Sequence, residues 1–447
     1  MKPKYIYISF GIVFTFFVLF LFKREKAKTE LTLIERTGTI NSSSEWLNAK
    51  AAIQKLLADL RSNPDNIKSK MQLAFAYIQE SRVTGNHGYY DKAALQLIDE
   101  ILEARPNDYE GLCAKATILL SQHHFSEALV LGQQILKENS HSAYGYGVLT
   151  DAHVELGNYA EAIKSADRMI SLRPDIRSYS RVSYLREIVG DYAGAIDAMK
   201  MAVASGIPGM EQTEWARVYI GHLYEMTGQY DEAANQYQLS LYHRPHFAFG
   251  LAGMGRIEKS KQNYAEAVKY FSNAKFTIKD YAFYDECADI YRSMQKPDSA
   301  NNELTEAIDM LSASSDKESN AVHGHYSDRE LALLYLKKYR YDLALQHALT
   351  EYNRRPKNID VNQTLAWVRY RRGEYTEANK NIDVALGTNS RNPILLFQAG
   401  LIKARAGNII AGKKLLEQSL AINRVISNDL KWEAKEILNT NELYTLK

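Results

Sequence analysis

The glycines near residue 250 are the first group whose spacing could do chemistry, because glycine-rich turns cradle phosphate groups. Gly250, Gly253 and Gly255 stand close together in the sequence. A nucleotide-binding loop follows a β-strand and opens a helix, but no strand precedes these glycines, and they fall inside a predicted helix. We interpret them as residues at which helices pack closely, and we predict no cofactor-binding residue.

Two histidine pairs and two cysteines have side chains that bind metal ions. His123 and His124 are adjacent, and His323–His325 holds two histidines around a glycine. Each pair lies at a predicted loop or helix end without a third ligand nearby, whereas zinc sites use three or four protein ligands. Cys113 and Cys287 fall inside two distant predicted helices, so we interpret them as small buried apolar residues. We therefore predict no metal site.

No pattern typical of catalysis or of nucleic-acid binding accompanies these residues. The sequence contains no nucleophile motif, and none of its acids forms a pair marked out for acid–base chemistry. Lys and Arg total 55 against 53 acids, which gives a formal net charge of +2. A nucleic-acid-binding face would need a concentration of positive charge. We predict a non-catalytic protein without a nucleic-acid partner.

A small residue recurs along the chain at an interval of about 34 residues. The copies are Ala93, Ala128, Ala162, Ala195, Ala233, Ala267, Ala300, Ala344, Ala378 and Gly412. Three residues before them stand Tyr90, Phe125, Tyr159, Tyr192, Tyr230, Tyr264, Pro297, Tyr341, Tyr375 and Ile409. An aromatic ring at a turn packs across two helices, and a small residue beside it lets those helices approach closely. The pattern predicts a stack of helical hairpins.

This pattern resembles the tetratricopeptide repeat (TPR) family, whose period is about 34 residues. The resemblance covers residues 66–424. It implies an all-α fold, a right-handed α-solenoid of about nine or ten repeats whose first helices line a concave face. Two departures from the family pattern are the scarcity of tryptophan at its tryptophan position and Gly412 in place of the last alanine.

The resemblance also implies which side chains point into the concave groove, namely those two, five, nine and twelve residues into each repeat. Carried onto this sequence, the groove residues are Tyr144, Asp151, Tyr184, Glu187, Trp215, His222, Glu225, Phe249, Arg256, Lys259, Asp285, Asp289, Arg292, Tyr326, Arg329, Trp367 and Tyr370. Rings supply contact area at low entropic cost and charges fix register, so the set suits a protein or peptide partner. The alternative is that several of them pack against the next repeat while the charges are solvated.

Five cations recur at the ends of three successive predicted first helices. They are Lys337, Lys338, Arg371, Arg372 and Arg405. Stacking would align them into a basic ridge for an acidic partner or for anionic lipid headgroups. The interpretation that we favour is that cations stand at helix carboxyl ends because the helix dipole stabilises them there.

The chain opens with an apolar run from Tyr5 to Phe22 that ends at Lys23 and Arg24. At about 1.5 Å per residue it is just long enough to cross a bilayer. A cleaved signal peptide, the open alternative, has a shorter apolar run followed by small residues. We predict a single-pass membrane anchor over residues 1–28. The positive-inside rule leans towards a cytoplasmic body, and an exported body is the other alternative.

The rest of the chain divides by polarity and by irregular spacing. We predict a tether over residues 29–44, an amino-terminal solenoid block over 45–311, an irregular linker over 312–324, a carboxy-terminal block over 325–424, and a capping helix with a tail over 425–447. Within these segments, Glu45–Leu60 has the amphipathic spacing of a helix, which is either a capping helix or a decayed repeat. Asp429–Leu438 has the spacing of a terminal helix that covers the last apolar face of a solenoid.

Together these predictions indicate a non-catalytic TPR scaffold that binds protein or peptide partners through its concave groove at a membrane. A second hypothesis, from another class, is an accessory subunit of a membrane-associated enzyme or of an envelope-biogenesis complex. A stoichiometric enzyme in the purified protein would favour the second. The sequence predicts neither the partner nor the oligomeric state.

Overall fold

The computed structural model describes residues 31–314, 324–422 and 428–439, and every regular element within these ranges is helical. The elements are η1 (Gly38–Ser42), α2 (Ser44–Ser62), α3 (Ile67–Thr84), α4 (His87–Ala104), α5 (Tyr109–Ser121), α6 (Phe125–Glu138), α7 (Ala143–Glu155), α8 (Tyr159–Leu172), α9 (Ile176–Ile188), α10 (Tyr192–Ala204), α11 (Glu211–Met226), α12 (Tyr230–His243), α13 (Ala248–Ser260), α14 (Tyr264–Thr277), α15 (Tyr281–Ser293), α16 (Pro297–Ser314), α17 (Asp328–Lys337), α18 (Tyr341–Arg354), α19 (Ile359–Arg371), α20 (Tyr375–Ala385), α21 (Pro393–Arg405), α22 (Ile409–Ile422) and α23 (Asn428–Asn439).

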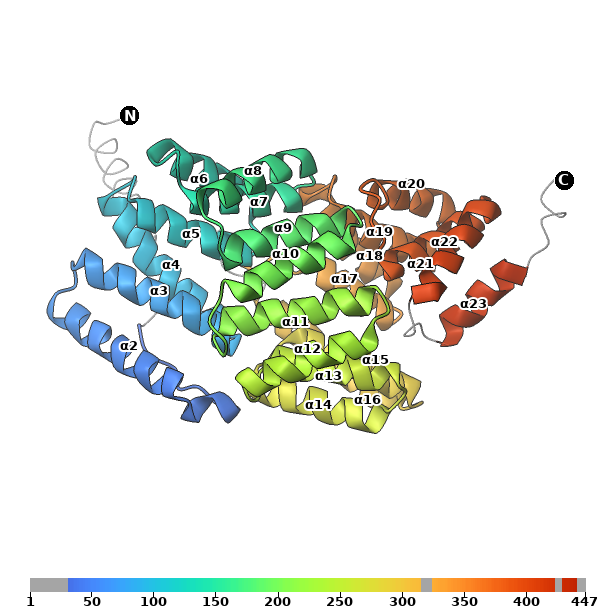
Figure 1. Ribbon diagram of the computed structural model, residues 1–447, viewed down its shortest axis with the longest axis horizontal. Coiled ribbons are helices and arrows are strands. Elements are labelled where there is room, and N and C mark those ends of the chain that lie inside the picture. The colour runs from blue at the N-terminus through green and yellow to red at the C-terminus, as the bar shows by residue number, and fades with distance from the viewer. Residues whose placement is uncertain (1–30, 315–323, 423–427, 440–447) are drawn as a thin grey trace, which may run out of the picture.

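Helices α3 to α22 form ten hairpins, each packed on the next (Figure 1). This arrangement confirms the predicted all-α stack of hairpins, and the handedness of the superhelix stays a prediction. Helices α2 and α23 lie at the two ends, where the sequence predicts covering helices. The predicted anchor over residues 1–28 and most of the linker over 312–324 fall outside the described residues. No helix in the described part of the chain has the length and apolar character needed to cross a bilayer.

The small residue of each repeat lies where its two helices cross. The alanines at this position are at most 1% exposed. Gly412, which departs from the family pattern, is explained by the close approach of α21 and α22. A Cβ atom at Gly412 would lie 2.7 Å from the carbonyl oxygen of Gly400 and 2.8 Å from the amide nitrogen of Ala404. The last hairpin therefore requires glycine, because its helices are too close for alanine.

The turn inside the hairpins has a repeated backbone conformation. The residue two positions before the second helix has a left-handed φ in all ten hairpins. Glycine holds this position in six hairpins and another residue in four, namely Gly85, Gly157, Gly190, Gly228, Gly373, Gly407, His123, Gln262, Gln295 and Tyr339. Since residues other than glycine enter this conformation at a cost of about 1 kcal/mol, the geometry is set by the stack rather than by glycine alone.

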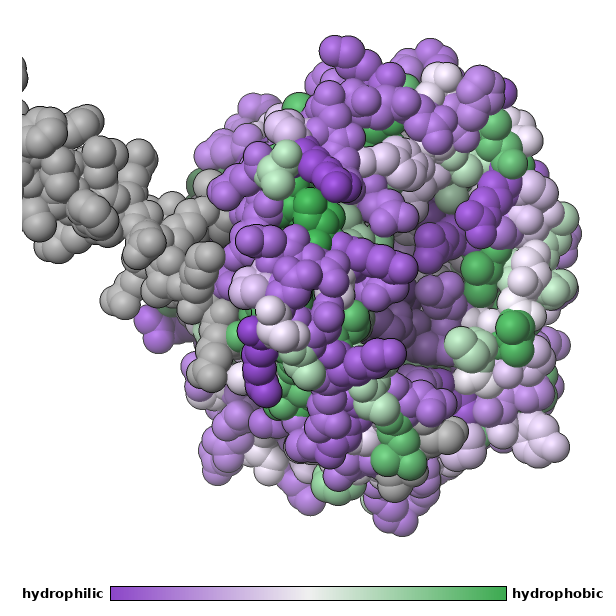
Figure 2. All heavy atoms as spheres, turned by 90° about the vertical axis from the view of Figure 1, so that its left-hand side faces the viewer, coloured by the Kyte–Doolittle hydropathy of each residue, from purple (hydrophilic) through white to green (hydrophobic). Residues whose placement is uncertain are grey.

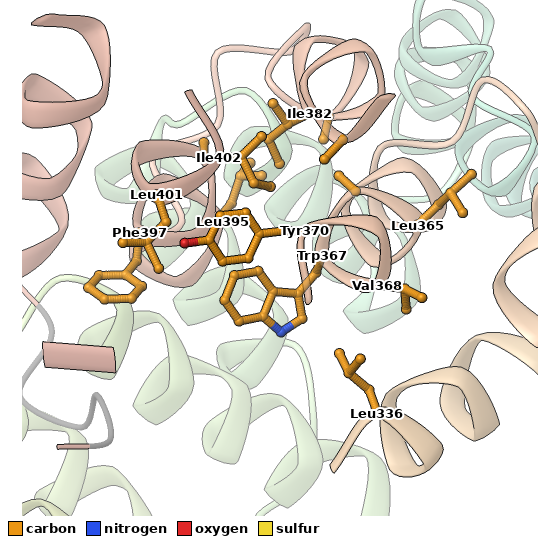
Figure 3. Packing of buried hydrophobic residues seen from close by; sticks show 14 of the residues in the cluster. Leu336, Leu365, Trp367, Val368, Tyr370, Ile382, Leu395, Phe397, Leu401 and Ile402 are labelled. Carbon is orange, nitrogen blue, oxygen red and sulfur yellow. The ribbon is translucent and has the colours of Figure 1, made fainter. Parts of the chain in front are cut away.

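Buried hydrophobic clusters follow one another along the stack, and the largest one in the described part of the chain lies near the carboxyl end. Figure 3 shows residues of this carboxy-terminal cluster. There Leu365 and Val368 of α19 pack with Ile402 of α21, and all three side chains are fully buried. Helix α23 adds Ala434 and Ile437 to this cluster. The end helix thereby covers an apolar face that would otherwise meet water, which is the role of a solenoid cap.

The stack curves so strongly that its second half packs back on its first half. The turn inside a hairpin contacts the connection between two later hairpins, about 200 residues further on. We call this line of contacts the seam. Its pairs are Gly85 with Ile278 and Lys279, His123 and His124 with Gly324 and Tyr326, Gly157 with Lys357, Gly190 with Asn389 and Arg391, and Gly228 with Ile422. One turn of the superhelix therefore closes every six hairpins or so.

The segment predicted as a polar tether is bound to the first hairpin along its described part. Arg36 is buried, and its Nε and Nη2 atoms donate to the Glu80 carboxylate at 2.8 and 2.6 Å. The Tyr90 hydroxyl donates to the carbonyl oxygen of Ile34 at 3.0 Å. The prediction of a free tether misses this packing, because the contacts are made by carbonyl groups and one buried cation rather than by a periodic apolar stripe.

Candidate binding site on the concave face

The first helices of the hairpins form the inner side of the superhelix. They contact one another directly over most of the stack, from α3 and α5 to α19 and α21. Figure 2 shows the molecule hollowed near its centre, and the walls of the hollow are mainly hydrophilic. The side chains of this concave face therefore line a hollow with mainly hydrophilic walls.

Ion pairs connect consecutive first helices along this face. The Arg181 guanidinium of α9 donates two hydrogen bonds, of 2.8 and 2.5 Å, to the Asp151 carboxylate of α7. In the same way the Nε atom of Arg256 on α13 donates to the Glu225 carboxylate on α11 at 3.1 Å. Burial opposes the charge of Arg256, but Glu225, Tyr237 and Glu286 together outweigh it and raise the pKa of Arg256. These pairs hold their side chains in fixed positions on the concave wall.

The network continues into α15 and α17 with alternating charges. The Lys259 Nζ atom lies 2.8 Å from Glu286 and 3.9 Å from Asp289. The Lys337 Nζ atom lies 2.6 Å from Asp285 and 3.0 Å from Asp289. Burial opposes the charge on Lys337, but the two aspartates outweigh it and raise the pKa of Lys337. In addition, the Arg292 guanidinium donates to the backbone carbonyl of Lys337.

Glu187 on α9 occupies a different environment. Its Oε2 atom accepts a hydrogen bond of 2.6 Å from the Tyr219 hydroxyl on α11, and its Oε1 atom lies 3.8 Å from the Nε2 atom of His222. Burial raises the pKa of Glu187 to about 7 and lowers the pKa of His222 to about 4. The Tyr219 ring packs against Trp215, with ring centroids 5.3 Å apart. This is the most aromatic part of the described concave face.

A pocket of about 250 Å³ lies between this region and the seam. Asp151, Glu155, Arg181 and Tyr184 are among the residues that line it. Burial raises the pKa of Glu155 to about 7, although the Arg355 guanidinium donates to its carboxylate across the seam. The pocket thus combines paired charges with the aromatic rings of Phe125 and Tyr184.

The predicted groove residues fall into three groups. The first group lies in the ion-pair network or the aromatic region just described, and its members are Asp151, Glu187, Trp215, His222, Glu225, Arg256, Lys259, Asp285, Asp289 and Arg292. Tyr184 lines the pocket. Arg329 of α17 acts electrostatically on Glu155 and Tyr184 of the same wall. Tyr144 and Phe249 pack instead against neighbouring repeats, the former on α5 and the latter beside Phe283.

The third group lies away from the open groove. Trp367 and Tyr370 are 7% and 5% exposed, stacked on each other within the carboxy-terminal core (Figure 3). The Tyr370 hydroxyl donates to Glu433 of α23, so the end helix contacts this ring. Tyr326 lies in the seam, stacked on His124 with ring centroids 4.1 Å apart. The predicted groove is therefore closed at its carboxyl end by α23 and at Tyr326 by the seam.

Several residues of the network escaped the sequence analysis. Arg181 and Tyr219 each lie three residues before a predicted groove residue, and Glu286 and Lys337 follow the same faces. Residues three apart on a helix share a face, so a search for charges one turn from each predicted position would have found Arg181 and Tyr219. Glu155 and its partner Arg355 had no such signal, because they meet across the seam.

The histidines and cysteines have structural surroundings. His123 lies edge-on to His325, with ring centroids 4.4 Å apart, and burial lowers the pKa of His325 to about 4. No group of three or more potential ligands lies together within the described residues, and His323 lies outside them. Cys113 and Cys287 are buried, and burial raises the pKa of Cys113 to about 12. The glycines around residue 253 pack against aromatic rings, including Tyr237 and Phe271.

The cations of the predicted basic ridge have acidic partners or polar contacts. Lys337 belongs to the concave network, and the Lys338 Nζ atom donates to Thr305 at 2.7 Å. Arg372 pairs with Asp342 and Glu374, and Arg405 pairs with Glu436 at 2.9 Å. The Arg371 guanidinium lies over the Trp367 ring, 5.8 Å from the ring centroid. Because neighbouring acids pair with Lys337, Arg372 and Arg405, the five cations do not form a continuous ridge of uncompensated positive charge.

Stability should depend on pH through Glu187. Its pKa is about 7 in the folded chain against 4.5 in the reference state, so the folded state favours the protonated form. The resulting stabilisation is complete below pH 4.5 and is lost as the pH rises towards 7. Glu187→Gln, which is always neutral, is expected to raise the free energy of unfolding by about 3 kcal/mol at pH 8 and by less than about 1 kcal/mol at pH 5.

Urea unfolding at the two pH values measures this difference. Glu232→Gln is the matched control, because Glu232 is an exposed acid on α12. The control should be unchanged at both pH values. If Glu187→Gln changes the free energy of unfolding equally at pH 5 and pH 8, burial of the Glu187 carboxylate does not make stability depend on pH.

No protein-family model and no curated protein sequence matches the chain. Among solved structures it is similar to the Cut9–Hcn1 hetero-tetramer of the APC/C, with 14% identity over 89% of this chain and 74% of that chain and a TM-score of 0.41. It is also similar to the human IFIT1 dimer with PPP-AAAA, with 12% identity over 84% of this chain and 88% of that chain and a TM-score of 0.45. A TPR protein of Thermus thermophilus shares 21% identity over 46% of this chain and 98% of its own, with a TM-score of 0.36. Since these TM-scores are below 0.5, the description of the fold rests on the helices and contacts above.

Proposed function

We propose that this chain is a TPR-like scaffold that binds an extended segment of a partner protein along its concave face. The observation that carries the proposal is the concave wall itself. The hollow has mainly hydrophilic walls (Figure 2). Ion pairs such as Asp151–Arg181 connect side chains of successive first helices and hold them in place. A preformed surface binds a partner without the entropic cost of ordering its own side chains.

The composition of the wall also fits an extended segment. Trp215 is 38% exposed and offers a ring to an incoming chain, while charged groups on either side recur from helix to helix. Rings supply binding energy, and charges at a regular spacing fix the register of the bound segment. A segment that follows the stack would meet these groups in sequence.

We further propose that the scaffold works at a membrane. The support is the charge-free apolar run from Tyr5 to Phe22, followed by Lys23 and Arg24. Alkaline extraction of membranes that contain the full-length chain tests this part of the proposal. Release into the supernatant would contradict an integral anchor.

The concave site is tested by purifying the full-length chain in detergent and identifying its partners by mass spectrometry. Trp215→Ala removes a half-exposed ring of the concave wall, and Tyr242→Ala removes a 79% exposed ring from α12 as the matched control. We expect Trp215→Ala to reduce partner recovery at least tenfold, whereas Tyr242→Ala leaves it unchanged.

Thermal unfolding of both variants should show that they remain folded. An unchanged partner set in folded Trp215→Ala would contradict binding through the concave face. A stoichiometric enzyme among the partners lost would favour the accessory-subunit hypothesis over a general scaffold.

A further inference from the structure

Glu187 differs from the other carboxylates of the concave wall in having no cation beside it. The paired carboxylates include Asp151 with Arg181, Glu225 with Arg256, and Glu286 with Lys259. Within the described part of the chain, Glu187 lies within ion-pair distance of His222 alone, at 3.8 Å. Burial lowers the pKa of His222 to about 4, so this imidazole is neutral near pH 7. The Glu187 carboxylate is therefore nearly buried, at 9% exposure, without a positive counter-charge.

A second polar group beside Glu187 also lacks a partner. The Tyr192 side chain is 7% exposed, and its hydroxyl makes no hydrogen bond within the described residues. Burial raises the pKa of the Tyr192 hydroxyl, and the negative charge of Glu187 raises it further. The Glu187 carboxylate is therefore near this hydroxyl. Buried polar groups are almost always hydrogen-bonded, so an unsatisfied hydroxyl next to an unpaired carboxylate indicates a place that something else fills.

Aromatic rings surround the carboxylate. Tyr219 donates its hydroxyl to Glu187, and its ring lies 5.3 Å from Trp215 and 5.6 Å from His222, measured between centroids. Tyr184, one turn before Glu187 on α9, is close enough for Glu187 to raise its pKa after burial. The faces of aromatic rings attract cations, and the attraction is strongest where water is excluded.

We propose that Glu187, with the rings of Tyr184, Trp215 and Tyr219, forms a binding site for one lysine or arginine side chain of the partner segment. This inference rests on the proposed function, since the cation arrives on a segment that lies along the concave face. The ammonium or guanidinium group supplies the charge that Glu187 lacks, and the rings enclose the aliphatic part of the side chain.

The groups that face Glu187 are Tyr184 of α9, Tyr192 of α10, Tyr219 and His222 of α11, and Asp360 of α19. Except for the Asp360 carboxylate, which adds negative charge, these groups are uncharged near pH 7. Binding of a cation requires ionised Glu187, so affinity should fall about tenfold between pH 8 and pH 6. Glu187→Gln should abolish this pH dependence.

The test starts with a phage-displayed library of random dodecapeptides selected on the full-length chain in detergent. The best peptide is then synthesised twice, once as selected and once with its lysine or arginine replaced by norleucine. We expect the replacement to weaken binding to the wild-type chain at least tenfold at pH 8 and to have little effect on Glu187→Gln. Glu232→Gln should behave like the wild-type chain, because it removes the same charge from an exposed position on α12.

The results separate this inference from the proposed function. Two results would contradict the cation site but not binding in the concave groove. In the first, the peptides need Trp215 but contain no lysine or arginine that binding requires. In the second, replacement by norleucine weakens binding to the wild-type chain and to Glu187→Gln equally. If no peptide is enriched, or if the enriched peptides bind Trp215→Ala as well as the wild type, both the site and the proposed function are wrong.

Discussion

Replacing Gly157 with alanine is expected to lower the free energy of unfolding by about 4 kcal/mol, the largest effect that we predict for a single methyl group. Gly157 has a left-handed φ of +77° in the turn between α7 and α8. A Cβ atom there would lie 2.4 Å from the carbonyl oxygen of Lys357 in the opposing turn of the superhelix. Because the obstacle is backbone, the seam itself has to move apart.

The seam at this point is held by polar contacts that a displacement would break. The Asn358 Nδ2 atom donates to the carbonyl oxygen of Glu155 at 3.0 Å, and the Ile359 amide donates to the Tyr159 hydroxyl at 2.9 Å. The Arg355 guanidinium pairs with the Glu155 carboxylate. Each lost hydrogen bond costs about 1 kcal/mol, so their sum accounts for about 3 kcal/mol of the expected loss.

Gly373 provides a matched control for the backbone strain. It holds the same turn position with a φ of +80°, and a Cβ atom there would meet no described atom within 4 Å. Gly373→Ala should therefore cost only the strain of a left-handed alanine, about 1 kcal/mol. Urea unfolding compares the two variants, and hydrogen exchange at the Ile359 amide reports on the seam. Equal losses in both variants would mean that the seam does not contribute to stability.

Replacing Arg36 with alanine is expected to cost about 3–5 kcal/mol. The Arg36 and Glu80 side chains are 1% and 2% exposed and 2.6 Å apart. Burial opposes the charge of Arg36, but Glu80 and Glu45 outweigh it and raise the pKa of Arg36. Removing the guanidinium leaves the Glu80 carboxylate buried without a cation, which is costlier than the loss of the contact itself.

The double variant Arg36→Met with Glu80→Gln separates these two contributions. It removes both charges and keeps similar volumes, so it should recover more than half of the stability lost in Arg36→Ala. Melting temperature measures the recovery, and limited proteolysis near residues 31–44 shows whether the segment stays bound to α3. A double variant as unstable as Arg36→Ala would show that packing, including the Arg36 contact with the Trp46 ring, dominates instead.

The hairpins were predictable because their signals are local. A small residue and an aromatic three positions apart set the crossing of two adjacent helices, and the structure places the alanines of this register at no more than 1% exposure. The covering helices at both ends were found from amphipathic spacing within a single element. Such patterns depend on residues within one or two helical turns of each other, so they can be read directly from sequence.

The concave residues were predicted less completely, because a position in a repeat does not state what lies opposite. Trp367 occupies a predicted groove position, yet it is buried in the carboxy-terminal core, stacked on Tyr370. Glu187 also occupies such a position, but only the structure shows that it lacks the cation that other carboxylates of the wall possess. The repeat pattern predicts where a residue stands on its own helix. Its contacts with other side chains depend on the neighbouring hairpins and on the end helices.

The sequence by itself determined the repeat length and the all-helical hairpin fold, because both depend on short-range periodicity. Tertiary structure alone decided the seam, the packing of the segment around Arg36 and the unpaired state of Glu187. Gly157 and Lys357 stand 200 residues apart and share no pattern. Their contact depends on small rotations added over several hairpins, and the physical reason is that curvature is a property of the whole stack rather than of any one repeat.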